Sequence, residues 1–362
     1  MKRLLILFAL LALLLALLPA CGSGKSAVSG ETVTFTDSAG RQVTVPAEVT
    51  RVAPSGAVAA MFLASVCPEY MVCIASTPSS AQYKYLDPSL IKLPTTGQLY
   101  GSKSTINLEA LLSARPQVIV DLGDAKDGIS RDMNALQKQT GIPVVFIEAD
   151  LEHMAEAFRM LGKLLSGKED RCAELAAYVE ETMGLAKENR GKIPEAERLR
   201  VMYTTGVTGL NTNAEGSTQA QVLPLVGAVN AIVVEDVSNK GGGNTINLEQ
   251  MFNYDPDVVI FTTGSMYADA AEDPSWSQLR AIQNGDYYEI PGLPYNWMSS
   301  PPSLNMLLGI RWLGNLLYPE VYDYDMAAEA RRAYKLLWGY DLTEAEAAEM
   351  LANSAGKRGS GS

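Results

Sequence analysis

The chain has 362 residues, of which 47% are hydrophobic, and it carries a formal net charge of −12 at pH 7. So acidic a composition argues against nucleic-acid binding, because that function needs basic patches. The single histidine, His153, and four cysteines without a CxxC pair exclude a Cys/His zinc site, and the length favours two domains over one.

The first predicted element is an export signal over residues 1–20. Two basic residues precede an apolar run at residues 4–18, which is shorter than the ~20 residues of a membrane-spanning helix. The sequence Leu-Pro-Ala-Cys that ends at Cys21 resembles a bacterial lipobox, which implies lipidation of Cys21 and a place on the extracytoplasmic face of the cell membrane. An ordinary secreted protein is the alternative. Residues 21–30 are mostly small and polar, as expected of a flexible tether.

Residues 31–150 predict an N-terminal lobe in which strands alternate with helices. The lobe opens with a β-hairpin over residues 31–45, whose turn contains a glycine. The alternation that follows is typical of a parallel sheet covered by helices on both faces. The expected strands are at residues 51–53, 71–75, 118–122 and 144–147, and the expected helices at residues 58–66, 108–114 and 129–140.

Residues 151–192 predict a long helical region, broken near Gly167, that separates this lobe from a second one. A continuous helix over residues 169–190 would span ~33 Å, enough to cross a domain. The α/β pattern restarts in residues 193–354, and residues 355–362 are expected to form a disordered tail. In the second lobe we expect strands at residues 199–204, 231–234, 258–262 and 287–290, and helices at residues 219–226 and 302–317.

An internal repeat relates the two predicted lobes. The sequence Thr-Ile-Asn-Leu-Glu occurs at residues 105–109 and again at residues 245–249, and at the same offset each copy is followed by a proline and an apolar strand. The asparagines suit helix N-caps, and the glutamates suit the positive end of a helix dipole. Such a helix start explains the Asn and the Glu but not the shared proline and strand. We therefore expect two related α/β lobes joined by one long helix.

The chain resembles the ABC-importer binding proteins for iron–siderophore complexes, haem and cobalamin. The resemblance rests on the opening hairpin, the repeated Asn-Leu-Glu, the bridging helix and residues 316–320. It implies an α/β fold of two Rossmann-like lobes with a ligand cleft between them, and a monomer without catalytic residues, cofactor or metal. Such a protein delivers its ligand to a permease dimer with its ATPase. The match implies that Glu109 and Glu249, one on each lobe, dock into permease arginines; two surface acids favoured only by the helix dipole are the alternative.

Polar and aromatic residues that follow the predicted strands are the candidates for ligand contact. In open α/β sheets ligands bind beyond the carboxyl ends of the strands, and two facing lobes create a cleft there. Aromatic side chains in loops rich in Gly, Pro and Ser suit a large planar or apolar ligand. The predicted contacts are Ser55, Tyr83, Gln98, Tyr100, Asn213, Asn244, Tyr295 and Trp297.

The residues leave several alternatives open. Molybdate or tungstate could bind to the same fold, held by Ser55 and by the backbone of the glycine run at residues 241–243. An adhesion or sensor module would not need the paired glutamates. An α/β enzyme would need a nucleophile elbow or cluster-binding cysteines, and the sequence has neither. Cys67 and Cys73 could form a disulfide or be two small buried residues.

Overall fold

The computed structural model describes residues 30–100, 105–239 and 242–354. The predicted signal, the predicted lipidation site Cys21, the tether up to residue 29 and the predicted tail at 355–362 lie outside the described residues. Within the described ranges, no helix combines the length and the apolar character needed to cross a membrane.

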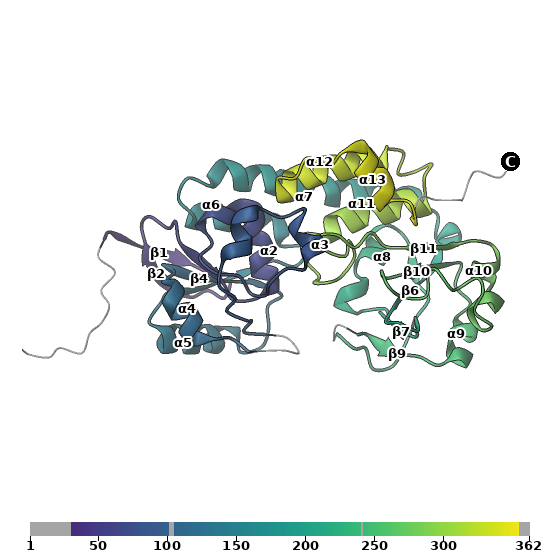
Figure 1. The fold of residues 1–362 in the computed structure, drawn as a ribbon, viewed down its shortest axis with the longest axis horizontal. Helices are drawn as coiled ribbons and strands as arrows, with labels where there is room; N and C mark the ends of the chain where they lie inside the picture. The colour runs from purple at the N-terminus through teal and green to yellow at the C-terminus, as the bar shows by residue number, and fades with distance from the viewer. Residues whose placement is uncertain (1–29, 101–104, 240–241, 355–362) are drawn as a thin grey trace, which may run out of the picture.

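Two α/β lobes lie at opposite ends of the molecule, and a layer of helices runs along one side of both (Figure 1). The N-terminal lobe contains an antiparallel hairpin and a three-stranded parallel sheet in the order β3-β4-β5. Strand β4 is central and almost entirely buried, as its apolar sequence predicts. The elements are β1 (Thr32–Thr36), β2 (Gln42–Pro46), β3 (Val52–Pro54), α2 (Ala57–Val66), α3 (Ser80–Tyr83), α4 (Leu108–Ala114), β4 (Val118–Gly123), α5 (Ile129–Thr140) and β5 (Val144–Glu148).

The C-terminal lobe contains a six-stranded sheet in the order β11-β10-β6-β7-β9, with β8 also paired to β6. Strands β8, β6, β10 and β11 are parallel, whereas β7 and β9 add an antiparallel edge. The elements are β6 (Arg200–Thr205), β7 (Asn211–Thr212), α8 (Val222–Leu225), β8 (Val229–Asn230), β9 (Asn244–Thr245), α9 (Leu248–Tyr254), β10 (Val258–Phe261), α10 (Arg280–Gln283) and β11 (Tyr287–Glu289). The predicted fold class, two α/β lobes, is therefore confirmed.

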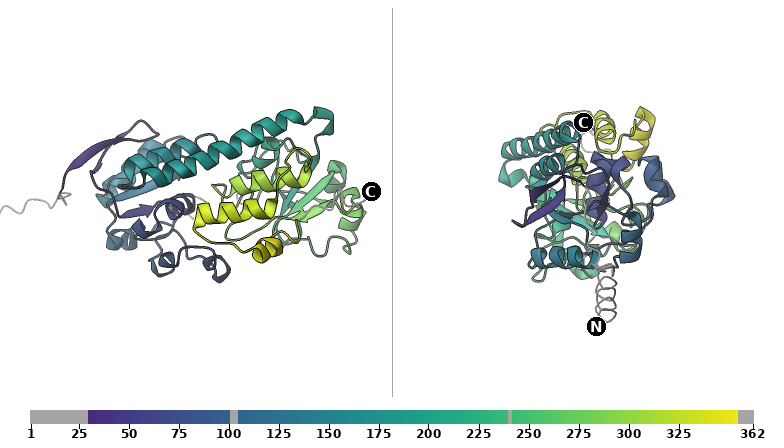
Figure 2. Two further views of the ribbon diagram at one scale, coloured as in Figure 1. Left: turned by 90° about the horizontal axis from the view of Figure 1, so that it is seen from above. Right: turned by 90° about the vertical axis from the view of Figure 1, so that its left-hand side faces the viewer.

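Helices α6 (Met154–Leu164) and α7 (Glu169–Lys192) form the connection between the lobes. The chain reverses between them at Gly167, whose φ of +69° lies in the left-handed region, so the predicted break is confirmed. The 24 residues of α7 span about 36 Å at the usual rise of 1.5 Å per residue. The two helices pack side by side, and α7 continues past the N-terminal lobe to the other end of the molecule (Figure 2).

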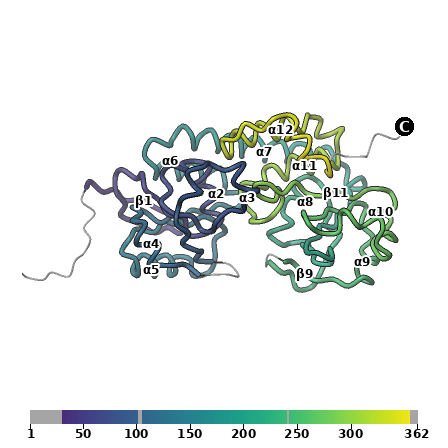
Figure 3. The backbone as a smooth tube through the Cα atoms, in the orientation of Figure 1, coloured from purple at the N-terminus to yellow at the C-terminus, as the bar shows by residue number. Residues whose placement is uncertain are grey.

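Helices α11 (Met306–Leu317) and α12 (Met326–Trp338) lie next to α7, and α13 (Glu344–Met350) packs against α12. Helix α12 crosses back to the N-terminal lobe and packs against α2, above the junction of the lobes (Figure 3). Tyr85, which follows α3, lies between Tyr334 and Tyr340, at ring-centroid distances of 5.6 and 5.0 Å. One hydrophobic core therefore extends from the N-terminal lobe through α7 into the C-terminal helices.

The sequence repeat corresponds to a structural repeat. The side chain of Asn107 accepts a hydrogen bond from the first turn of α4 at 3.0 Å, and Asn247 does the same for α9 at 2.8 Å. Both helices have seven residues, and both end at a left-handed residue, Arg115 or Asp255. A buried parallel strand follows each one, β4 or β10. The predicted N-caps and the two related lobes are thus confirmed.

Some predicted elements differ from the structure. Residues 71–75 form no strand but two isolated bridges, from Met71 to Val52 and from Ile74 to Thr95. The strand expected at 231–234 is the shorter β8, two residues earlier. The helix expected from residue 302 begins at Met306, after a loop that contains two prolines. Cys67 and Cys73, like Cys172, are free and buried, so the two do not form a disulfide.

Candidate functional site

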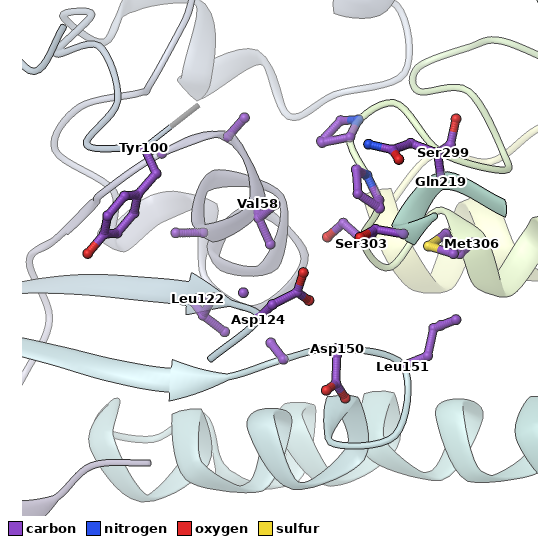
Figure 4. A pocket seen from close by; sticks show the side chains of 18 of the residues that line it. Val58, Tyr100, Leu122, Asp124, Asp150, Leu151, Gln219, Ser299, Ser303 and Met306 are labelled. Atoms are coloured by element: carbon purple, nitrogen blue, oxygen red, sulfur yellow. The ribbon is translucent and has the colours of Figure 1, made fainter. Parts of the chain in front are cut away.

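A cavity of about 760 Å³ lies between the lobes, and both lobes line it (Figure 4). From the N-terminal lobe come the loops that follow β3, β4 and β5, because the carboxyl ends of parallel strands meet at one edge of a sheet. The C-terminal lobe contributes the segment before α8 and the loop before α11. Its lining residues include Thr218, Gln219, Asn239, Ser299, Ser303 and Met306.

The N-terminal wall of the cavity is acidic. Asp121, near the end of β4, accepts a hydrogen bond from the Ser55 hydroxyl, and burial raises the pKa of Asp121 to about 6. The pKa of Asp124 is also raised, by partial burial and by the nearby carboxylate of Asp150. The ammonium of Lys126 lies 3.9 Å from the centre of the Tyr100 ring, which is the geometry of a cation–π contact.

The C-terminal wall presents hydroxyl and amide groups. The amide nitrogen of Gln219 donates to the backbone oxygen of Asn239 at 3.1 Å. The Ser299 hydroxyl is paired with the Tyr203 hydroxyl at 2.5 Å. In contrast, the side-chain oxygens of Gln219 and Ser303 are buried and have no hydrogen-bond partner among the described residues. A ligand in the cavity is therefore positioned to bond with these two oxygens.

Three of the eight predicted ligand contacts line the cavity. Ser55 and Gln98 do so next to Gly56, just before α2. Tyr100 lies on the side of the N-terminal lobe (Figure 4). The hydroxyl of Tyr100 donates to Asp132 at 3.1 Å, so its ring rather than its hydroxyl faces the Lys126 ammonium. Contact of the three residues with a ligand stays a prediction.

The structure places the two aromatic residues of the 291–300 loop away from the cavity. Trp297 is fully buried and packs against Tyr334 of α12, with ring centroids 6.4 Å apart. Tyr295 packs against Trp338, and it lines a separate small pocket beside α2. Both rings are covered because α12 crosses over this loop on its way to the N-terminal lobe.

The remaining three predicted residues also do not line the cavity. Asn213 is buried within the C-terminal lobe. The side chain of Asn244 bonds to the backbone of the 236–238 loop, accepting from Ser238 at 3.0 Å and donating to Asp236 at 2.7 Å. Tyr83 ends the short helix α3, which lies where the N-terminal lobe meets the C-terminal lobe (Figure 1).

The cavity residues that were not among the predicted contacts include Asp121, Asp150, Gln219 and Ser303. A signal for Asp121 exists in the sequence, since it is a lone carboxylate inside the apolar run of β4. Gln219 and Ser303 have no comparable signal, because they reach the cavity through the arrangement of the C-terminal lobe.

One group at the cavity rim could hold a metal ion. Ligand atoms of Glu148, Asp150 and His153 lie within 4.8 Å of one another, at the end of β5. Among the described residues they are the one such group of His, Cys, Asp and Glu side chains. Asp150 already accepts hydrogen bonds from the Nδ1 atom of His153 at 2.8 Å and from its backbone nitrogen at 2.9 Å, which stabilise the start of α6.

The predicted docking residues Glu109 and Glu249 are exposed. Each is the second residue of its helix, α4 or α9. The two helices lie on the side of the molecule opposite α7 and α12, one on each lobe (Figure 1).

Comparison with known proteins connects this architecture with solute binding. The family model "Periplasmic binding protein" matches residues 55–293, and no curated protein matches. An ABC transporter solute-binding protein from Sulfurospirillum deleyianum is 27% identical, with a TM-score of 0.80 over 88% of this chain and 99% of its own. A periplasmic solute-binding protein from Veillonella parvula is 22% identical, with a TM-score of 0.73 over 90% and 98% of the two chains.

A third solved structure is the molybdate-binding protein MolA of Haemophilus influenzae, bound to molybdate. It is 18% identical, with a TM-score of 0.69 over 86% of this chain and 99% of its own. Proteins of the matched family bind substrates for transport and are extracytoplasmic. The chain belongs to the periplasmic binding protein family and is a solute-binding protein of an ABC transporter.

Proposed function

We propose that the chain captures an iron complex or a corrinoid-type ligand in the cavity between its lobes and delivers it to the permease of an ABC importer. The observation that carries this proposal is the cavity itself, which both lobes line. Its volume of about 760 Å³ lies in the range typical of small-molecule sites. A solved structure of similar fold from Roseiflexus is a periplasmic haem-binding protein, at 16% identity.

Delivery would use Glu109 and Glu249 as one docking carboxylate on each lobe. Both are exposed, and their helices face the same side of the molecule. A permease that pairs arginines with both carboxylates would recognise the spacing of the lobes. Lipidation of Cys21 would hold the protein at the membrane surface near that permease.

The docking proposal is tested by uptake measurements in cells that carry the Glu109→Ala/Glu249→Ala double variant. We expect uptake to fall at least tenfold while the purified variant binds ligand as the parent does. Glu48→Ala/Glu272→Ala is the matched control, since it removes one exposed carboxylate from each lobe outside α4 and α9. Normal uptake by the docking variant would favour an adhesion or sensor role. Membrane fractionation of Cys21→Ser tests the lipid anchor, and release of this variant from the membrane is expected.

A molybdate or tungstate oxyanion is the second candidate, because the molybdate-bound MolA shares the fold. Ser55 was the expected hydroxyl donor, but it donates to Asp121 instead. The carboxylates of the N-terminal wall would also repel an anion. Native mass spectrometry of protein purified from its own host would distinguish an iron complex, a corrinoid and an oxyanion by mass.

A further inference from the structure

The charges on the cavity wall are unbalanced. Among the described lining residues, three are carboxylic acids, Asp121, Asp124 and Asp150, and one is basic, Lys126. The Lys126 ammonium lies over the Tyr100 ring, and this cation–π contact within the N-terminal lobe already stabilises its positive charge. A positively charged group in the cavity would therefore be stabilised more than a negative one.

The hydrogen-bonding groups point to the same ligand class. Gln219 and Ser303 are 7% and 2% exposed, and their side-chain oxygens have no partner among the described residues. Because the nitrogen of the Gln219 amide is held by Asn239, its oxygen is the atom left free, and it can only accept. A buried acceptor without a partner is unfavourable, and a donor on the ligand would remove that cost.

Two hydroxyl donors of the cavity, by contrast, already donate to acceptors within the protein. The hydroxyl of Ser55 donates to Asp121, and the hydroxyl of Thr218 donates to Asn239 at 3.2 Å. Figure 4 shows Gln219 and Ser303 reaching into the cavity from the C-terminal lobe, while Asp124 reaches into it from the opposite side. An acceptor on each wall, the Gln219 oxygen and the Asp124 carboxylate, thus faces one space, and the Ser303 hydroxyl can accept or donate there.

Apolar side chains also line the cavity, beside further amides and hydroxyls such as Gln98, Gln221 and Ser300. Val58, Leu122, Leu151 and Met306 line it between the two polar walls. A ligand that satisfies all of these surfaces has a positive charge, hydrogen-bond donors toward each lobe, and an apolar body.

We propose that the cavity selects a cationic metal complex or organic cation that carries N–H or O–H donors, and that it discriminates against anions. This inference rests on the proposed function, since it assumes that the cavity holds the transported ligand. Asp124 supplies charge from the N-terminal lobe, and Gln219 supplies a fixed acceptor from the C-terminal lobe. The preference is built from both lobes, so a cation with donors on two sides favours their closure.

The test uses two pairs of probes that differ chiefly in charge. Hexaamminecobalt(III) and hexacyanocobaltate(III) are both exchange-inert octahedral complexes; the first is a cation with N–H donors, and the second is an anion with acceptors only. Ferrioxamine B carries an ammonium group that its N-acetyl derivative lacks. Binding is measured by titration calorimetry at about 0.15 M salt, where charges beyond ~8 Å are largely screened.

We expect the cationic member of at least one pair to bind about tenfold more tightly than its partner. Asp124→Asn should weaken the cation by about threefold, as expected for a partly exposed charge pair, and Gln219→Leu by about fivefold. Asp127→Asn is the matched control, because it removes the same charge from the same loop at a position that does not line the cavity. Its affinities should equal those of the parent, and thermal melting checks that every variant is folded.

Each other outcome contradicts the inference. Equal or tighter binding of the anionic or neutral members overturns the charge preference but leaves the proposed function intact. An equal loss in Asp127→Asn shows that net charge, not the cavity, attracts the cation. Failure of all probes to bind also overturns the inference. The uptake experiment with the Glu109/Glu249 variant does not depend on probe charge, so it shows separately whether the proposed function fails.

Discussion

The buried carboxyl of Asp121 should make the stability of the protein fall as the pH rises from about 4 to about 6. Asp121 is 5% exposed, and burial raises its pKa from 3.8 to about 6, although the hydrogen bond from Ser55 acts in the opposite direction. Between these two pH values the native state binds more protons than the unfolded chain. The free energy of unfolding therefore decreases across this window.

Asp121→Asn should remove that dependence. The asparagine keeps an oxygen that accepts from Ser55, but it has no charge to bury. A shift of about two pKa units corresponds to about 3 kcal/mol, which is an upper bound on the stabilisation at neutral pH. We expect a gain of about 1–3 kcal/mol near pH 7.5, seen as a rise in Tm of roughly 2–6 °C. Near pH 4, where Asp121 is protonated in the native state, the gain should vanish.

The measurement is thermal melting of parent and variant, without ligand, at several pH values. Asp127→Asn serves as the control, since it removes the same charge at an exposed position. The reasoning about burial is refuted if Asp121→Asn melts below the parent near pH 7.5. It is also refuted if the gain in Tm is the same at both pH values.

Three further predictions concern the helical layer and the cavity rim. Arg311→Met should cost about 1.5–3 kcal/mol in urea unfolding, because Glu181 of α7 and Glu329 of α12 lose their buried partner and keep only the more exposed Arg332; a loss under ~1 kcal/mol would contradict this. Gly309→Ala places a Cβ 2.2 Å from a backbone oxygen and should lower Tm markedly, whereas Gly184→Ala, in the open middle of α7, should leave it unchanged or raise it. NMR titration of the single histidine, His153, should give a pKa above 6.5 because Asp150 accepts from its ring, and Asp150→Asn should lower it; an unchanged value would exclude that bond.

The features that the sequence predicted correctly are those set by local patterns. The two copies of Asn-Leu-Glu predict two capped helices, because a cap depends on residues within one turn. The long apolar stripe of residues 169–190 and the glycine before it similarly predict α7 and its start. Ser55 was expected at the cleft because it follows β3, and it does line the cavity, because the ends of parallel strands meet at one edge; Gln98 and Tyr100 line the cavity too, although no strand of this sheet ends just before them.

The features that were missed depend on distant segments. Trp297 and Tyr295 lie in a polar, proline-rich loop that resembles a ligand-binding loop, and packing against α12 makes Trp297 a core residue and partly buries Tyr295. No local pattern shows that α12 crosses back to α2. Gln219 and Ser303 stand out because their side-chain oxygens have no hydrogen-bond partner among the described residues. A sequence does not show which polar groups stay unpaired after folding.

This crossing also bears on how far the lobes can move. A single helix between lobes predicts a small closure, and the structure adds a second connection through the C-terminal helices. Gln82 donates to the backbone oxygen of Pro294 at 2.8 Å, and the ring of Tyr85 is held between two tyrosines of the C-terminal region. Opening the lobes by a wide angle would expose these buried rings to water.

We therefore expect the radius of gyration from X-ray scattering to change by less than about 1 Å when ligand is added. Tyr85→Ala should increase the radius of the unliganded protein and the change on binding, because it removes the buried ring between the lobes. Tyr83→Ala, two residues away, is the control and should behave as the parent does, because the ring contacts with Tyr334 and Tyr340 belong to Tyr85. A large contraction of the parent on binding would mean that α7 and the α2–α12 contact bend together as a hinge, and that neither limits closure.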